Sequence, residues 1–188
     1  MAFRLASPIS LLALLTLSAC TAKWSALVRY SQEPAPASEP PVVSLYVAVL
    51  QSSLPPDQRE LVLAPQPASD TALWPIEVGT TPSHWADTLK REVHAALFDA
   101  DLGRDAPAEA VVAAARVLGL RVSMDTSSAP ISQASAVAVL QLSKPGFNSD
   151  STIAAVRLRP LGGWCGQPTR VLLLARRPGL RWRVWWRS

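Results

Sequence analysis

The sequence has few cysteines and histidines, two of each among 188 residues, and no acidic residue from Arg157 to its end. Two cysteines cannot build the network of disulfides that holds many small exported domains together. No Gly-Lys-Ser/Thr phosphate loop, dinucleotide-binding glycine pattern or Gly-x-Ser-x-Gly turn occurs, so nothing marks a nucleotide site or a serine nucleophile. The sequence therefore nominates no catalytic residue and no cofactor-binding residue.

Metal-ligating residues are equally sparse. His84 and His94 are ten residues apart, and a helix would separate them by about 280° around its axis, so they do not share a face. Asp99, Asp101 and Asp105 lie close together in the sequence. They lack the glycine and the final Glu of an EF-hand loop, and helix capping is the simpler interpretation. The sequence predicts no metal site.

The N-terminus is apolar, but its apolar run is short. Residues 1–19 carry one positive charge, Arg4, followed by the run Ile9–Leu17. A transmembrane helix needs roughly 20 residues, whereas a run of this length is typical of the core of a signal peptide. We therefore predict that residues 1–19 are a signal peptide.

This segment ends in Leu17-Ser18-Ala19-Cys20, which resembles the lipobox of bacterial lipoproteins. The resemblance implies that Cys20 becomes the lipid-modified first residue of the mature protein, held stably in the membrane by several acyl chains. Thr21, not Asp, follows the cysteine, which in Gram-negative lipoproteins implies transport onward to the outer membrane. The predicted location is thus the cell envelope, at the outer membrane and facing the periplasm. The alternative is an ordinary signal peptide cut near Ala22.

A proline-rich segment follows the cysteine. Ser31–Pro41 contains no large apolar residue, so it has nothing to bury, and we expect residues 20–41 to form a flexible tether. An extended chain of this length reaches about 60 Å at most. A single globular domain is expected from Val42 to Ser188.

Apolar spacing predicts helices first and strands last in this domain. The expected helices are Pro41–Ser52, a segment from an N-cap at Ser83 to about Asp99, and Pro107–Leu118, which Asp105 caps and Gly119 ends. The expected strands are Ala136–Leu142, Ile153–Arg159, Arg170–Arg176 and Arg181–Trp186, with shorter runs at Glu60–Ala64 and Arg121–Met124. Short turns between the last four favour an antiparallel meander. The predicted class is α+β, with N-terminal helices packed on a meander of about four strands, as in cystatin-like or nuclear-transport-factor-like folds.

Positive charge is concentrated in those strands. Eight arginines lie between Arg157 and the C-terminus, whereas the first 156 residues contain ten basic and fourteen acidic residues and so carry a net charge of −4. Strand alternation places Trp182, Val184 and Trp186 on a core-facing side, and Arg181, Arg183, Trp185 and Arg187 on a face toward water. Arginine interleaved with tryptophan suits anionic ligands. The alternative is that these arginines only solvate the sheet.

The C-terminal block resembles an uncharacterised group of bacterial exported proteins. The resemblance rests on Ser143-Lys-Pro-Gly-Phe-Asn148, Gly162-Gly-Trp-Cys-Gly166 and the closing Gly179, Trp182 pair. Members carry a Cys-Gly-Gly-x-Cys-Gly loop, and this chain has Leu161 in place of the first cysteine. Because Cys20 is expected to be acylated, this departure leaves Cys165 without a partner for a disulfide within the molecule, and our hypothesis is that packing from Trp164 holds the loop instead. The resemblance implies no activity.

The remaining cysteine also resembles two catalytic motifs, and neither is complete. In Trp164-Cys-Gly-Gln-Pro168 the second cysteine of a thioredoxin-type site is absent, so dithiol exchange is not available. A papain-type site needs a histidine base, and both histidines lie far upstream without a supporting motif. We interpret Cys165 as a partly buried loop thiol.

Three functions are compatible with these features. The first is a non-enzymatic envelope lipoprotein that binds an anionic envelope component, such as lipid head groups, lipopolysaccharide or wall polymers, or another envelope protein, through its basic C-terminal sheet; nucleic acid is not expected. The second is an envelope hydrolase with an unrecognised site, which requires a polar pocket with perturbed carboxylates. The third is a structural or assembly subunit, which requires a large exposed apolar patch.

Overall fold

The computed structural model describes residues 28–65, 84–99, 104–124, 138–161 and 169–187. Its helices are α2 (Pro41–Ser53), α3 (Asp87–Asp99) and α4 (Ala108–Val117). Its strands are β1 (Glu60–Leu63), β2 (Arg121–Met124), β3 (Ala138–Leu142), β4 (Gly146–Phe147), β5 (Ile153–Leu161), β6 (Arg170–Ala175) and β7 (Arg183–Arg187). No helix in these ranges is both long and apolar enough to cross a bilayer.

All seven strands form one mixed sheet in the order β2-β1-β3-β5-β6-β7, with β4 paired to β5. The predicted antiparallel neighbours are present, because β3, β5, β6 and β7 pair antiparallel in sequence order. The sheet is nevertheless larger than the predicted four-stranded meander. β1 and β2 extend it beyond β3 through parallel pairs. The predicted class α+β is therefore confirmed, whereas the prediction of a purely antiparallel sheet was wrong.

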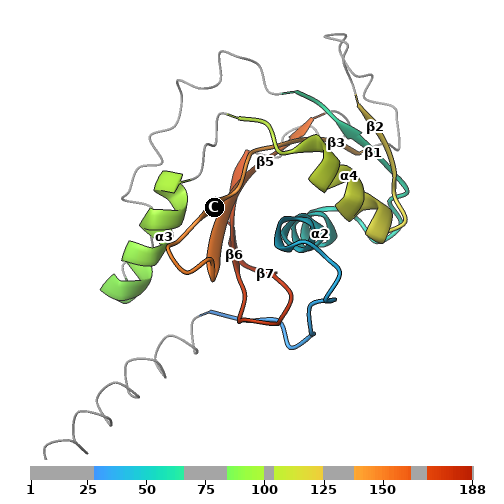
Figure 1. Cartoon of the computed structure of the whole chain (residues 1–188). Helices are drawn as coiled ribbons and strands as arrows, with labels where there is room; N and C mark the ends of the chain where they lie inside the picture. The colour runs from blue at the N-terminus through green and yellow to red at the C-terminus, as the bar shows by residue number, and fades with distance from the viewer. Residues whose placement is uncertain (1–27, 66–83, 100–103, 125–137, 162–168, 188) are drawn as a thin grey trace, which may run out of the picture.

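Helices cover both faces of this sheet, as Figure 1 shows with α3 on one side and α2 and α4 on the other. On β5 and β6 successive residues point to opposite faces. Ala154, Val156 and Leu172 join the core under α2 and α4, whereas Ala155 and Leu173 join the core under α3. The expectation of helices on one face only, and with it the cystatin-like or nuclear-transport-factor-like shape, was therefore wrong. Part of the surface predicted to face water, including Trp185, lies on the side that α3 covers.

Local sequence signals explain how the helices on the α2 side begin and end. Pro40 is the N-cap of α2 and Pro41 its first residue, where a missing N–H costs nothing. Gly119, with φ of 69°, follows α4 in the left-handed conformation that favours glycine. Asp105 does not cap α4 as predicted, since the N-cap is Pro107 and makes no side-chain bond. Asp105 instead forms a bridge with Ser143.

A β-bulge interrupts the pairing of β6 with β7 between Leu173 and Leu174. Leu174 pairs with Val184 and Leu173 pairs with Trp186, which leaves Trp185 as the extra residue of the bulge. The predicted strict alternation over residues 181–187 is therefore wrong beyond Val184. Trp186 lies on the α3 side with Leu173, and Arg187 lies on the α2 side with Leu172.

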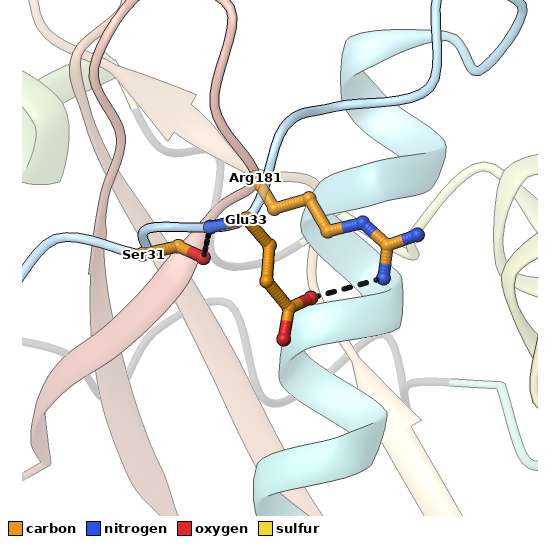
Figure 2. A network of polar contacts seen from close by, with 3 residues as sticks. All are labelled: Ser31, Glu33 and Arg181. Carbon is orange, nitrogen blue, oxygen red and sulfur yellow. Dashed lines mark hydrogen bonds and ion pairs between the residues drawn. The ribbon is translucent and has the colours of Figure 1, made fainter.

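The globular part begins before the predicted boundary at Val42. Val28 is buried in the core under α3, and the chain from there runs along the end of the sheet toward α2 (Figure 1). Ala35 N–H donates to the carbonyl of Gly179 at 2.9 Å, and Arg181 N–H donates to that of Glu33 at 2.9 Å. The Glu33 carboxylate lies 3.5 Å from the guanidinium of Arg181, and a dashed line marks this ion pair in Figure 2. The described part of the proposed tether is thus bound to the turn between β6 and β7.

Asp150 makes a local network in the turn between β4 and β5. Its carboxylate accepts bonds from the backbone N–H and the hydroxyl of Thr152, at 3.1 and 2.6 Å. Partial burial by itself would raise the pKa of Asp150, but the bonds from Thr152 and Asn148 outweigh it, and the pKa is lowered below 3.8. A lowered folded-state pKa stabilises the fold above the ordinary value and less as pH falls through the lowered one.

We expect Asp150→Asn to be less sensitive to acid than the unmodified protein. Both proteins would be unfolded with urea at about pH 5 and at about pH 2.5, a window that spans the titration of an ordinary aspartate. The loss of unfolding free energy between these two pH values should be smaller for Asp150→Asn. An equal loss in both proteins would show that the turn network does not favour the ionised carboxyl.

Candidate anion-binding site

Strand register brings two arginines to the same face of the sheet. Arg170, the first residue of β6, pairs with Leu158 of β5, and Arg187, the last residue of β7, pairs with Leu172 of β6. Leu158 and Leu172 both belong to the core on the α2 side. Arg170 and Arg187 are therefore diagonal neighbours on that side, which in an antiparallel sheet corresponds to a separation of about 7–8 Å.

These arginines border a cavity of about 210 Å³ at the C-terminal end of α2. Its lining combines a polar rim with an apolar floor: Ser52, Ser53, Leu140, Leu158, Pro160, Arg170, Leu172 and Arg187. None of these described lining residues is acidic, so among them the two positive charges are offset by the negative partial charge at the C-terminal end of α2 and not by a carboxylate. An anion entering the cavity would reduce the repulsion between the guanidinium groups.

Arg187 is already oriented by the helix. Its Nη2 donates to the carbonyl of Ser52 at 2.6 Å, close to the end of α2 at Ser53, where backbone carbonyls lack helical partners and a cation is favourable. This bond fixes one edge of the guanidinium and leaves other N–H groups for a ligand. Arg170 is half-buried, and no hydrogen bond or ion pair joins its side chain to the described part of the chain. The site thus pairs a fixed arginine with an available one.

The four residues predicted to form one cationic face are divided between the two sides. Arg187 lies on the α2 side, whereas Arg183 pairs with Ala175 of the α3-side core. The ring of Trp185 lies 5.0 Å from that of Trp85, next to α3. Arg181 makes an ion pair with Glu33. The bulge is the reason for this division, and the sequence carries no clear signal for it.

Arg170 was missing from the predicted face although its signal was present. It shares the alternation of Leu172 and Leu174 within the predicted strand Arg170–Arg176, which marks it as belonging to the same face. Arg187 was assigned to the opposite face by uninterrupted alternation from Arg181. That Arg170 and Arg187 lie close together therefore follows only from the strand register in the structure.

Other predicted features lie partly outside the described residues. The signal peptide, Cys20, Trp164 and Cys165 fall in ranges that the structure leaves undescribed, as does the N-cap predicted at Ser83. Within the described ranges, no group of three histidine, cysteine, aspartate or glutamate side chains is placed to hold a metal ion.

Comparison with known proteins gives no relative from which a function could be transferred. No family model matches the chain, and neither a curated protein nor a solved structure is significantly similar to it. The features that bear on function are therefore the three-layered fold with its mixed sheet and the arginine-lined cavity.

Proposed function

We propose that this protein is a lipid-anchored component of the bacterial envelope that binds an anionic envelope ligand without chemically altering it. The observation that carries the proposal is the position of Arg170 and Arg187 as diagonal neighbours beside a cavity whose described lining has no acidic residue. Cys20 supplies the anchor, and the cavity supplies the binding site. The proposed location is the outer membrane, with the globular domain in the periplasm.

Phosphate is the chemistry that suits the site best. Arginine presents a planar fork of N–H donors that matches the oxygens of a phosphate, and two such forks can hold one group from two sides. Ser52 and Ser53 line the same cavity. The Ser52 hydroxyl already donates to the Val49 carbonyl at 2.9 Å, whereas the proton of the Ser53 hydroxyl can be donated to a further oxygen. The apolar floor of Leu140, Leu158 and Leu172 removes water from one side of the ligand, which strengthens the charged hydrogen bonds. With about 210 Å³, the cavity suits one small phosphorylated unit, because pockets for larger ligands span roughly 300–1,000 Å³.

Binding is favoured over hydrolysis by the composition of the same cavity. A hydrolase of the kind considered from the sequence needs a carboxylate or another base beside the bound ligand. Among the residues that the structure describes, this cavity is lined by two arginines, two serines and apolar side chains. Such a set positions an anion, and none of its members is a base at neutral pH.

We expect Arg170→Ala to weaken the binding of a small sugar phosphate about tenfold, corresponding to the loss of one charged hydrogen-bonding group worth about 1.4 kcal/mol. The measurement is calorimetric titration of the full mature protein with glucosamine 6-phosphate, with uncharged N-acetylglucosamine as the ligand control. Arg170 is the informative position, because Arg187 also holds the end of α2. Thermal unfolding would be recorded alongside to show that the variant remains folded.

Arg116→Ala is the matched protein control. Arg116 is an exposed arginine of α4, outside the cavity lining, and its removal changes the net charge by the same amount. It should leave the affinity unchanged. Equal weakening in both variants would indicate attraction by overall charge, and unchanged affinity in Arg170→Ala would overturn the proposed site.

A further inference from the structure

A second group of cations surrounds Tyr30, at the turn between β6 and β7. The guanidinium carbon of Arg177 lies 4.9 Å from the centre of the Tyr30 ring, and Nη1 of Arg183 is 3.5 Å from the Tyr30 carbonyl oxygen. Arg29, Arg177 and Arg183 are all exposed. Burial raises the pKa of Tyr30, the Arg177 charge opposes this rise and the nearby Asp150 adds to it. Glu33 also lies at this turn, where it makes an ion pair with Arg181.

Two tryptophans, Trp185 and Trp186, pack against the same core as Tyr30. Trp185 and Trp186 lie with their ring centres 5.0 and 5.7 Å from that of Trp85, and both remain half-exposed. They pack against the same core that contains Val28. We call Arg29, Tyr30, Arg177, Arg183 and Trp185 the Tyr30 patch. Exposed arginine beside tryptophan and tyrosine is the combination that favours the head-group region of a bilayer.

The length of chain before the patch limits where it can lie. Val28 is buried and follows Cys20 by eight residues. Eight residues span at most about 28 Å when fully extended. With acyl chains on Cys20, the start of the ordered domain is therefore restricted to a narrow layer above the lipid surface, far closer than the 60 Å allowed by a tether reaching Pro41.

We propose that the Tyr30 patch lies against the bilayer that holds the acylated Cys20. The three arginines contact anionic head groups, and Tyr30 and Trp185 sit at their depth. This inference depends on the acylation included in the proposed function, but on none of the residues of the phosphate site.

The same orientation directs the phosphate site away from the membrane. Arg183 begins β7 near the patch and Arg187 ends it at the cavity, and four residue steps of strand span about 13 Å. The patch and the cavity therefore lie at opposite ends of β7, so a soluble ligand can reach the cavity without displacing the patch from the lipids.

The test uses a single fluorescent label placed beside the patch. In the Cys165→Ser background, Gln32→Cys introduces a thiol at an exposed position two residues after Tyr30. Ser123→Cys introduces one at an exposed position on β2, at the opposite edge of the sheet. Acylation blocks Cys20, so an environment-sensitive dye labels only the new thiol. The acylated proteins are placed in vesicles of phosphatidylethanolamine with a minority of phosphatidylglycerol and a spin-labelled lipid as quencher.

The label at position 32 should be quenched and its emission shifted to shorter wavelength, whereas the label at 123 should be unaffected. Replacing Arg177 or Arg183 by glutamine, which removes one positive charge, should weaken the contact about fivefold for each arginine, and high salt should weaken it as well. Equal signals at 32 and 123, or none at 32, would overturn the inference. A signal at 32 that arises in native membranes but not in protein-free vesicles would instead identify a protein partner, and would also overturn it. If mass measurement shows Cys20 without acyl chains, the membrane inference fails while sugar phosphate binding remains testable on its own.

Discussion

Replacing Trp182 by alanine is expected to lower the free energy of unfolding by about 3–5 kcal/mol, the usual cost of deleting a large buried aromatic side chain. Trp182 is 3% exposed and belongs to the core on the α2 side. Its Nε1 donates to the carbonyl of Pro41 at 3.1 Å, its ring lies 6.0 Å from that of Phe147, and Arg176 stacks 4.7 Å from its centre. One side chain thus joins the start of α2, the β4 strand and the turn that leads into β7.

Thermal unfolding would register this change as a decrease of about 10 °C or more, given the size of the domain. Trp182→Phe is the matched control, because it keeps most of the ring volume and loses the bond to Pro41. It should cost about 1–2 kcal/mol. If Trp182→Ala unfolds at the temperature of the unmodified protein, then the contacts between α2 and the C-terminal strands do not hold the domain together.

Trp182 also supports both proposed sites, because it holds the chain leading into β7 against the start of α2. Arg187 of β7 bonds to the end of α2, so the phosphate site requires β7 and α2 to keep their relative position. The Tyr30 patch also depends on the turn before β7, because Arg177 and Arg183 flank it. Partial loss of the Trp182 contacts should therefore weaken both sites before the domain unfolds.

Local sequence patterns predicted the local structure well. The helix expected at Pro41–Ser52 is present as Pro41–Ser53, since prolines mark its start and Pro55 and Pro56 follow its end. The strands expected at Ile153–Arg159 and Arg170–Arg176 are present with small changes in their ends. Their antiparallel order followed from short connections, which bring successive strands together.

Non-local features could not be predicted in the same way. The run Glu60–Ala64 was recognised as strand-like, but its parallel pairing with β2 and β3 depends on partners far away in the sequence. The bulge at Trp185 inverts the expected faces of Trp186 and Arg187, because one unpaired residue shifts every later side chain. Val28 and Tyr30 precede the proline-rich segment in the run Trp24-Ser-Ala-Leu-Val-Arg-Tyr30, whose apolar residues carried a signal for burial that the prediction of a tether over residues 20–41 did not use.

Substitution of Asn148 is expected to have the second large effect on stability, because its buried side-chain amide makes four hydrogen bonds. It is 4% exposed. Its Oδ1 accepts from the N–H groups of Thr152 and Ile153 at 2.9 and 2.8 Å. Its Nδ2 donates to Glu92 of α3 at 2.9 Å and to the Thr152 hydroxyl at 3.2 Å. The residue therefore shapes the turn between β4 and β5 and attaches that turn to α3.

Asn148→Asp should keep the acceptor bonds and turn the contact with Glu92 into a repulsion between two carboxylates. We expect a loss of about 2–4 kcal/mol at pH 7, since a buried donor is lost and a like charge is gained. Repulsion raises the folded-state pKa of the carboxylate pair, and a raised pKa means that protonation stabilises the folded form as pH falls through it. The loss of unfolding free energy relative to the unmodified protein should accordingly shrink between pH 7 and about pH 4.5.

Urea unfolding at the two pH values measures this loss. Asn148→Ala is the control: it introduces no carboxylate beside Glu92, so its loss of unfolding free energy should change far less with pH. A deficit in Asn148→Asp that stays constant over this range would mean that Glu92 turns away from residue 148, and that α3 is held to the sheet by apolar packing alone.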